Sequence, residues 1–240
     1  MEFKEKVAII TGGNSGIGKA IAIALAREGA KIVITARRHA ENQKVAQILI
    51  QQYGTSTLGI KADVAKEEDC ERLVSETVKA FGTIHILVNS AGVGGGDTIE
   101  KTSTKDFDRI LKTNLYGTFW CARAAYKQMR RNKSKNNEPR GMIINLSSVA
   151  GKFAWAGTGA YSASKFGVQA LTQALADEGK QDNIKVTAIC PAMVATPMTG
   201  KKGHDYLQPE DVAETVLYLA RLSPAAWPTE IVIDRKGAAL

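Results

Sequence analysis

The sequence predicts an α/β fold in which helices cover both faces of a doubly wound, seven-stranded parallel sheet. Short runs rich in β-branched residues alternate along the chain with stretches that have the apolar spacing of helices. The strand-like runs, such as Lys31–Thr35 and Ile84–Val88, are almost continuously apolar, which is typical of strands covered on both faces. No tandem repeat or low-complexity linker interrupts the alternation, and we expect a single domain over residues 1–240.

The individual elements follow from this alternation in chain order. The first β-branched run leads through a glycine-rich loop directly into an alanine-rich helix, and the next five runs are each followed by a helical pattern. We expect strands near 6–11, 31–36, 57–63, 84–89, 141–147, 184–190 and 229–234, and helices near 16–29, 40–53, 67–81, 104–131, 160–180 and 209–222. The polar stretch 132–139 is interpreted as a surface loop rather than a domain boundary.

Composition excludes several classes of protein. No run of eighteen apolar residues occurs, so a membrane span is not expected. The first strand-like run begins at Lys6 and leaves no room for a signal peptide, so we expect a cytoplasmic protein. Cys70, Cys121 and Cys190 are far apart and lack CxxC spacing, which predicts buried free thiols rather than disulfides or a zinc site.

The chain is basic, with a net charge of +8 and a pI near 9.3. Such a charge raises the question of nucleic-acid binding, but no helix-turn-helix, zinc-finger or aromatic RNA-binding signature accompanies it. The densest basic stretch, 123–140, contains Arg123, Lys127, Arg130, Arg131, Lys133, Lys135 and Arg140 against one acid, Glu138. We interpret it as a solvated helix end and loop, with an acidic partner as the alternative, and expect no nucleic acid.

A glycine-rich loop, Thr11–Gly18, joins the first strand to the first helix. Gly12, Gly16 and Gly18 remove side chains where the backbone has to turn tightly and approach a pyrophosphate. The amino terminus of the following helix offers free N–H groups and a positive dipole end to that anion. The loop therefore predicts a dinucleotide site, and its expected cofactor-binding residues are Gly12, Asn14, Ser15, Gly16, Ile17 and Gly18.

The end of the second strand predicts which dinucleotide is bound. An NAD site places a carboxylate there to hold the ribose 2′-hydroxyl, whereas this chain has Ala36-Arg37-Arg38. Arg37 and Arg38 can hold a 2′-phosphate, since a guanidinium binds phosphate through two parallel hydrogen bonds. We therefore predict NADP(H) as the cofactor.

Three residues in the second half of the chain form a candidate catalytic group. Tyr161 and Lys165 are four residues apart, which places them on one face of a helix. A nearby ammonium favours the phenolate, so Lys165 is expected to lower the pKa of Tyr161 towards neutrality. Ser148 lies thirteen residues before Tyr161 and can hold a substrate oxygen. A Tyr-x-x-x-Lys pair alone carries little weight, and the surrounding motifs decide its meaning.

Together these features resemble the short-chain dehydrogenase/reductase family, in its compact branch without a separate substrate domain. Seven motifs occur in the family's order: the loop TGGNSGIG, Asp63-Val64, Asn89-Ser-Ala-Gly92, Asn114 in Thr-Asn-Leu, Ser148 in Leu-Ser-Ser-Val-Ala-Gly, Tyr161-Ser-Ala-Ser-Lys165, and Pro191 with Thr196. The resemblance covers nearly the whole chain and implies a Rossmann-type fold.

The resemblance also implies roles for these residues. Asp63 and Val64 would border the adenine, Asn89, Ala91 and Gly92 would line the cofactor floor, and Pro191, Val194 and Thr196 would frame the nicotinamide carboxamide. In the catalytic group, Ser148 would bind the carbonyl oxygen and Tyr161 would pass the proton. Lys165 would also bond the nicotinamide ribose, and Asn114 would kink its helix and hold a water that connects Lys165 to solvent. The thirteen-residue spacing to Tyr161 selects Ser148 over Ser147.

The chain departs from the family pattern at four places. Ser90 replaces a frequent second Asn, Ala192 replaces the Gly that usually follows the proline, and His85 replaces a common Asp. The tail after Glu230 lacks the glycine-rich ending of many fatty-acid ketoacyl reductases, which weakens that assignment without excluding it. His39, His85 and His204 share no ligand spacing, so no metal is expected.

The sequence thus predicts an NADP(H)-dependent carbonyl reductase that transfers a hydride between the nicotinamide and a small-molecule carbonyl or secondary alcohol, with Tyr161 as acid/base. A lid near 194–208 is expected over the substrate, and its Lys201 and Lys202 could meet an anionic substrate or simply be solvated. The alternatives are a reductase of carrier-tethered 3-oxoacyl groups, docked through the stretch 123–140, and a non-catalytic NADP-binding regulator.

The resemblance also implies an oligomer. Helices 104–131 and 160–180 resemble those through which family members pair, so a homotetramer is expected, with a dimer as the next choice. The apolar residues Phe119, Trp120, Ala124, Val168, Leu171 and Leu175 could be either core or interface.

Overall fold

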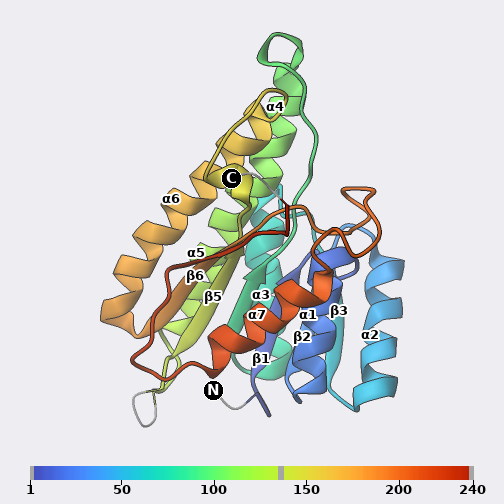
Figure 1. Ribbon diagram of the computed structural model, residues 1–240. Coiled ribbons are helices and arrows are strands. Elements are labelled where there is room, and N and C mark those ends of the chain that lie inside the picture. Colours follow the sequence, from blue (N-terminus) through green and yellow to red (C-terminus); the bar gives the residue numbers. More distant parts are fainter. Residues whose placement is uncertain (1–2, 135–137, 238–240) are drawn as a thin grey trace.

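The computed structural model describes residues 3–134 and 138–237, and across these residues seven parallel strands form one sheet (Figure 1). The strands are β1 (Val7–Thr11), β2 (Lys31–Ala36), β3 (Thr57–Lys61), β4 (Ile86–Asn89), β5 (Gly141–Leu146), β6 (Ile184–Pro191) and β7 (Glu230–Ile233). Each lies within two residues of its predicted bounds. The apolar runs were therefore a sufficient signal for the sheet.

The order of the strands is β3-β2-β1-β4-β5-β6-β7. The chain winds outward from β1 to β3, crosses back to β4 on the other side of β1, and winds outward again to β7. The prediction of a doubly wound sheet is confirmed. The crossovers diverge between β1 and β4, and in such sheets the opening at the carboxyl ends of these two strands is where ligands bind.

Helices cover both faces, because successive strand residues point to opposite sides of a sheet. Ile10 lies in the core beneath α1, α2 and α7, and its neighbour Ile9 lies in the core beneath α3, α5 and α6. Figure 1 shows α1 and α7 side by side in front of the sheet. The helices are α1 (Gly16–Arg27), α2 (His39–Tyr53), α3 (Glu67–Phe81), α4 (Thr104–Leu111), α5 (Gly117–Met129), α6 (Gly159–Asp182) and α7 (Pro209–Arg221).

The predicted helix near 104–131 is divided into α4 and α5. Between them, Lys112–Tyr116 forms a π-helical turn that contains the buried Asn114. Such a turn is rare and often occurs at functional sites. The kink implied for the helix of Asn114 takes this form, which apolar periodicity could not reveal.

Smaller differences have local causes. β3 ends at Lys61 rather than residue 63, because the backbone N–H of Asp63 donates to the carboxylate of Asp69 at 2.8 Å. Two short 3-10 turns, η1 (Ile99–Lys101) and η3 (Val149–Gly151), were not predicted, since three residues carry no periodic signal.

The predicted surface loop 132–139 is described only in part, since residues 135–137, including Lys135 of the basic stretch, lie outside the described residues. At its start, the Asn132 side chain donates to the carbonyl oxygens of Ile84 and Arg140, at 2.8 Å each, and so ties the loop to the sheet. Among the helices of the described chain, none has both the length and the apolarity needed to cross a membrane.

Candidate active site

A cavity of about 500 Å³ lies at the carboxyl ends of the strands, beside the reversal between β1 and β4. Thirteen of the predicted site residues line it: Gly12, Ser15, Gly16, Ile17, Gly18, Ala91, Gly92, Ser148, Tyr161, Lys165, Pro191, Val194 and Thr196. Asn14, Arg37, Arg38, Asp63, Val64, Asn89 and Asn114 lie outside this lining. The structure thus brings the glycine loop and the candidate catalytic group to one cavity.

The glycine loop forms one end of this cavity and has no room for side chains. Gly12 has φ +67, and a Cβ placed on it would lie 2.9 Å from the Cα of Ala91. A Cβ on Gly18 would lie 2.5 Å from the carbonyl oxygen of Gly12. The Thr11 hydroxyl accepts hydrogen bonds from the N–H groups of Ser90 and Ala91, at 3.1 and 3.0 Å, which holds the loop after β4 against β1.

The amino terminus of α1 reaches the same end of the cavity. Its N-cap residue, Ser15, makes no side-chain capping bond, so the N–H groups of the first turn are not occupied by a cap. Ser15, Gly16 and Ile17 line the cavity at this point. A bare backbone with unsatisfied donors and a positive dipole end is suited to a pyrophosphate.

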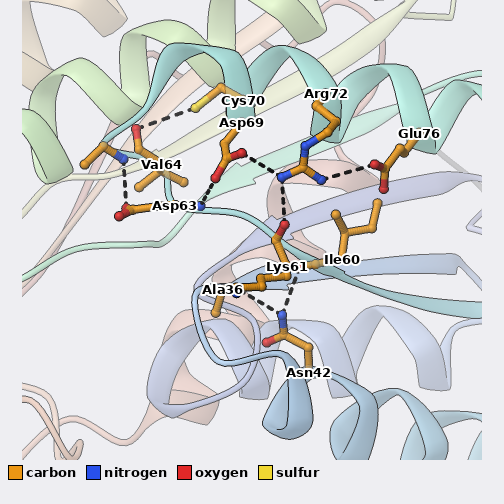
Figure 2. Close-up of polar contacts among 11 residues, drawn as sticks. Ala36, Asn42, Ile60, Lys61, Asp63, Val64, Asp69, Cys70, Arg72 and Glu76 are labelled. Carbon is orange, nitrogen blue, oxygen red and sulfur yellow. Dashed lines mark hydrogen bonds and ion pairs between the residues drawn. The ribbon is translucent and has the colours of Figure 1, made fainter.

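Asp63 and Val64, the residues expected to border the adenine, form hydrogen bonds with side chains of α3 (Figure 2). Asp69 accepts a hydrogen bond from the backbone N–H of Asp63, which lowers the pKa of the Asp69 carboxyl. Arg72 donates to Asp69 at 2.7 Å and to the Lys61 carbonyl oxygen at 2.9 Å, and so joins α3 to the end of β3. The turn at Asp63 is also closed by its own carboxylate, which accepts from the N–H of Ala65 at 3.1 Å.

Sequence reasoning missed Asp69 and Arg72, because no motif marks their contacts with the backbone of Asp63 and Lys61. It also missed Asn42, which is fully buried near the start of α2 and donates to the carbonyl oxygens of Ala36 and Ile60, at 2.9 Å each (Figure 2). The side-chain oxygen of Asn42 accepts a hydrogen bond from the side-chain nitrogen of Asn14 at 2.9 Å. Asn14 of the glycine loop is thereby linked to the end of β2. No periodic or motif signal identifies such a bridge.

Arg37 and Arg38 follow β2 on the surface. Both side chains are exposed, and Arg38 lies 3.8 Å from Glu41 in the first turn of α2. Their position after the second strand is the one that the sequence predicted for a group reading the adenosine ribose. Both lie outside the cavity lining.

The neighbouring serines Ser147 and Ser148 differ in their hydrogen-bond partners. The Ser147 hydroxyl is buried and donates to the Lys165 carbonyl oxygen at 3.1 Å, so it is occupied with the backbone of α6. The Ser148 hydroxyl accepts from the N–H of Ala150 at 3.1 Å and lies 3.4 Å from the Pro191 carbonyl oxygen. Burial raises the pKa of the Tyr161 phenol, and Ser148 acts in the opposite direction and lowers it. Ser148 is therefore the serine that contacts the tyrosine.

Lys165 does not act on Tyr161 as the sequence predicted. Burial dominates and raises the pKa of Tyr161 above its usual value, and Lys165 is not among the causes of the shift. The Lys165 ammonium lies 5.6 Å from the centre of the Tyr161 ring and donates to the Leu146 carbonyl oxygen at 2.7 Å. Burial lowers the pKa of Lys165 to about 8. The expected depression of the tyrosine pKa is wrong for this arrangement, because the effect of burial on Tyr161 outweighs the interaction that lowers its pKa.

Asn114 holds the loop that follows β4. Its side-chain oxygen accepts from the N–H of Val93 at 2.8 Å, and its side-chain nitrogen donates to the Val93 carbonyl oxygen and to the Ser164 hydroxyl, at 3.0 and 3.1 Å. A Cβ on Gly92 would lie 3.3 Å from the Asn114 oxygen and 4.0 Å from the Lys165 nitrogen. The side chains of Asn114 and Lys165 therefore both lie next to Gly92.

The remaining predicted residues support the frame. Asn89 is buried and donates to Asn145 of β5 at 2.9 Å, so it joins two strands rather than lining the cavity. Val194 forms a parallel bridge with Leu207, which closes the segment 194–207 into a loop beside the cavity. Thr196 exchanges hydrogen bonds with Thr199 inside this loop.

His85 and the three cysteines lie outside the cavity lining. His85 is partly buried, accepts from the N–H of Val7 at 3.0 Å, and has its pKa lowered to about 4, chiefly by burial. All three cysteines are buried and free. Within residues 3–134 and 138–237, no group of three or more His, Cys, Asp or Glu side chains could hold a metal ion.

Comparisons with known proteins agree with this geometry. Residues 6–207 match the family model described as short chain dehydrogenase. A 3-oxoacyl-acyl-carrier-protein reductase of Synechocystis sp. is 34% identical over 237 residues, covering 93% of this chain and 92% of that protein. An uncharacterised oxidoreductase of Staphylococcus aureus is 36% identical over 217 residues, covering 89% and 90%.

Two solved structures extend the comparison to three dimensions. The alcohol dehydrogenase of the archaeon Thermococcus sibiricus, complexed with 5-hydroxy-NADP, superposes with a TM-score of 0.89 at 27% identity, covering 98% of each chain. A metagenomic short-chain oxidoreductase in complex with NADP gives a TM-score of 0.85 at 28% identity, covering 98% of this chain and 99% of that one. The chain belongs to the short-chain dehydrogenase/reductase family of oxidoreductases.

Proposed function

We propose that this protein is an NADP(H)-dependent oxidoreductase that interconverts a small carbonyl compound and its secondary alcohol. The observation that carries this proposal is that Ser148, Tyr161 and Lys165 line the same cavity as the glycine loop. Hydrogen-bond donors for a substrate oxygen therefore lie beside a site suited to a dinucleotide. When bound, the nicotinamide supplies the hydride, with its two electrons, that turns a carbonyl carbon into that of an alcohol and leaves NADP⁺.

The cavity fits this cofactor at the end formed by the glycine loop. Gly12 and Gly18 leave bare backbone where a Cβ would collide, and the first turn of α1 supplies uncapped N–H groups for the pyrophosphate. The residues proposed to hold the dinucleotide are Gly12, Asn14, Ser15, Gly16, Ile17, Gly18, Arg37, Arg38, Asp63, Val64, Asn89, Ala91, Gly92, Tyr161, Lys165, Pro191, Val194 and Thr196. Of these, Asn89 would act through the sheet, because it bonds to Asn145 and lies outside the lining.

NADP is proposed over NAD because Arg37 and Arg38 follow β2, where an NAD site would need a carboxylate. Both arginines are exposed, and each guanidinium can bind a 2′-phosphate through parallel hydrogen bonds. The two NADP-containing structures that this chain resembles also favour this choice.

The chain's own residues supply the acid. In reduction, the Ser148 and Tyr161 hydroxyls hold the substrate oxygen, and Tyr161 gives it a proton as negative charge develops there. The phenolate that remains is stabilised by the Ser148 hydroxyl. The Lys165 ammonium, whose position the Leu146 carbonyl oxygen fixes, would bind the nicotinamide ribose. Because burial raises the pKa of Tyr161, the phenol is fully protonated at neutral pH and ready to donate.

Three further features belong to the proposal. Residues 1–240 act as one domain, and the segment 194–208 acts as the substrate lid, which the bridge between Val194 and Leu207 supports. A homotetramer is proposed, with a dimer as the alternative. Phe119 is exposed and lies with Leu171 in an apolar hollow, which favours an interface, whereas Val168 is buried in the core. The buried free thiols suit a reducing, cytoplasmic location.

The test is a panel of ketones, aldehydes and their alcohols, with NADPH consumption or formation followed by absorbance. We expect carbonyl-dependent oxidation of NADPH by at least one compound, and much slower oxidation of NADH. A protein that binds NADPH tightly but turns over none of the panel would instead be a regulator.

A second candidate is reduction of carrier-tethered 3-oxoacyl groups, which the Synechocystis relative favours. The basic stretch 123–140 would dock an acidic carrier, yet two of its cations are engaged within the chain. Arg123 pairs with Glu67 of α3, and Arg130 lies 3.1 Å from Asp182 of α6. Activity on a carrier-bound substrate that exceeds activity on a small thioester, and that falls steeply with salt, would establish this candidate.

A further inference from the structure

We infer that the substrate carries an apolar substituent, aromatic or branched, and no positive charge, and that Trp155 and Met198 select it. This inference rests on the proposed function and specifies the substrate class of the same cavity. Both side chains line the cavity at the end that holds Tyr161, on loops that follow β5 and β6.

Three loops converge at this end of the cavity. Gly94, after β4, lies under Met198, since a Cβ on Gly94 would be 3.5 Å from the Met198 Cγ and 3.6 Å from its sulfur. A Cβ on Gly96 would collide with the carbonyl oxygen of Gly157, so the loops after β4 and β5 meet backbone to backbone. Met198 and Trp155 are thus carried by loops that each approach the loop after β4, and both line the cavity.

The apolar side chains that line this part of the cavity are left exposed by the rest of the protein. Trp155 and Met198 are 53% and 54% exposed, and Met193 beside them is 41% exposed. Large apolar side chains that stay exposed around a concave site are typical of ligand binding. A flexible thioether can adjust to different apolar shapes, and an indole offers a flat face to an aromatic ring. A carbonyl compound with an apolar group would cover these side chains when its oxygen meets Tyr161.

The charges of the lining exclude a cationic substrate. Among the described lining residues, Lys165 and Lys201 are the charged side chains, and no carboxylate accompanies them. Lys165 is engaged with the Leu146 carbonyl oxygen, and Lys201 lies at the exposed rim, 5.8 Å from the centre of the Tyr206 ring. A cation would lose water without gaining a partner, whereas a neutral or anionic compound meets no repulsion.

The test compares four ketones in the NADPH assay: a neutral aryl ketone, aryl ketones of matched size with an ammonium or a carboxylate, and a small hydroxyketone. We expect kcat/KM for the neutral or carboxylated aryl ketone to exceed that for the other two by at least about 10-fold. A preference for the hydroxyketone or the ammonium compound would overturn the inference.

Variants then assign the selection to residues. In Trp155→Ala or Met198→Ala, kcat/KM for the aryl ketone should fall by about 10-fold or more, while that for the hydroxyketone stays within about two-fold. Phe153→Ala is the matched control, because Phe153 lies in the same loop, is similarly exposed and does not line the cavity. Equal losses for both ketones, or the same loss in Phe153→Ala, would contradict the assignment.

A binding measurement separates this inference from the proposed function. In Tyr161→Phe, titration with the aryl ketone should quench tryptophan fluorescence, and Trp155→Phe in that background should remove the quenching. If no carbonyl is reduced by the unmodified protein, the proposed function fails, and this titration still decides whether an apolar ligand binds at Trp155. Quenching that persists without Trp155 would refute the inference alone.

Discussion

The Lys165 ammonium donates a hydrogen bond to the Leu146 carbonyl oxygen, with a distance of 2.7 Å between the two atoms. Leu146 is the last residue of β5, so the carboxyl end of a central strand fixes where the charge of α6 is held. The cation is therefore positioned by the sheet and not by the tyrosine. Burial, and not this hydrogen bond, lowers the pKa of Lys165 to about 8 and raises the pKa of Tyr161.

The first prediction concerns the alkaline limb of the pH profile. The cation is the functional form of Lys165, and its pKa is lowered to about 8, so kcat/KM for reduction should be constant below that pH and fall above it. Burial raises the pKa of Tyr161, so loss of the phenol proton would produce a limb at higher pH still. The measurement is kcat/KM across roughly pH 6 to 10. A profile that stays flat beyond pH 9 would contradict the role of Lys165.

The second prediction is that His85 limits stability in mild acid. Its folded-state pKa is about 4 against an ordinary 6.5, so the unfolded chain takes up the proton first as pH falls. Stability contributed by the neutral imidazole is complete above about pH 6.5 and is lost towards pH 4. His85→Asn keeps an acceptor for the N–H of Val7 and should flatten this decline in denaturant titrations. The exposed His204→Asn is the control, and an equal effect there would refute the assignment.

The third prediction tests how α3 supports Asp63 and Val64, the residues expected to border the adenine. Asp69→Ala removes the acceptor for the Asp63 N–H and one partner of Arg72, so the Kd for NADPH should rise by about 3- to 10-fold. The kcat should change little, since Asp69 lies away from the cavity. Asp177→Ala removes an exposed carboxylate that bonds to Lys180 in its own helix, and should leave the Kd unchanged. An unaltered Kd in Asp69→Ala would show that this network is structural only.

The fourth prediction concerns the choice between NADP and NAD. Arg37→Asp removes a guanidinium that would bind the 2′-phosphate and adds a carboxylate, so affinity for NADPH should fall by about 10- to 100-fold. Affinity for NADH should stay the same or improve. Arg131→Asp makes the same charge change on a distant part of the surface and controls for net charge. Equal Kd values for NADPH and NADH in the unmodified protein would contradict the assignment of Arg37.

The sequence was sufficient for those parts of the fold and site that depend on local pattern. Apolar runs located the seven strands of the described chain, because strands covered on both faces admit few polar residues. The glycine loop could also be identified from the sequence, since Gly12 and Gly18 lie where a Cβ would collide with neighbouring atoms. The fixed spacing of Ser148, Tyr161 and Lys165 also identified three side chains that line one cavity.

The rest depended on partners that only the folded chain brings together. The Leu146 carbonyl oxygen is nineteen residues from Lys165 in sequence, and any carbonyl could have been its partner. The π-helical turn around Asn114 and the contacts of Asn42 with two strand ends likewise involve backbone atoms, which look alike in every sequence. Trp155 and Met198 carry no motif, and their presence in one cavity lining follows from the path of three loops.

The most direct test of the central claim compares Tyr161→Phe with the unmodified protein in two assays. The variant lacks the acidic proton but keeps the ring, so NADPH oxidation with the best carbonyl substrate should fall by at least about 1,000-fold. The Kd for NADPH, measured by fluorescence, should stay within about three-fold. If Tyr161→Phe retained most of its turnover while binding NADPH normally, the proton would come from another group and the proposed mechanism would be wrong.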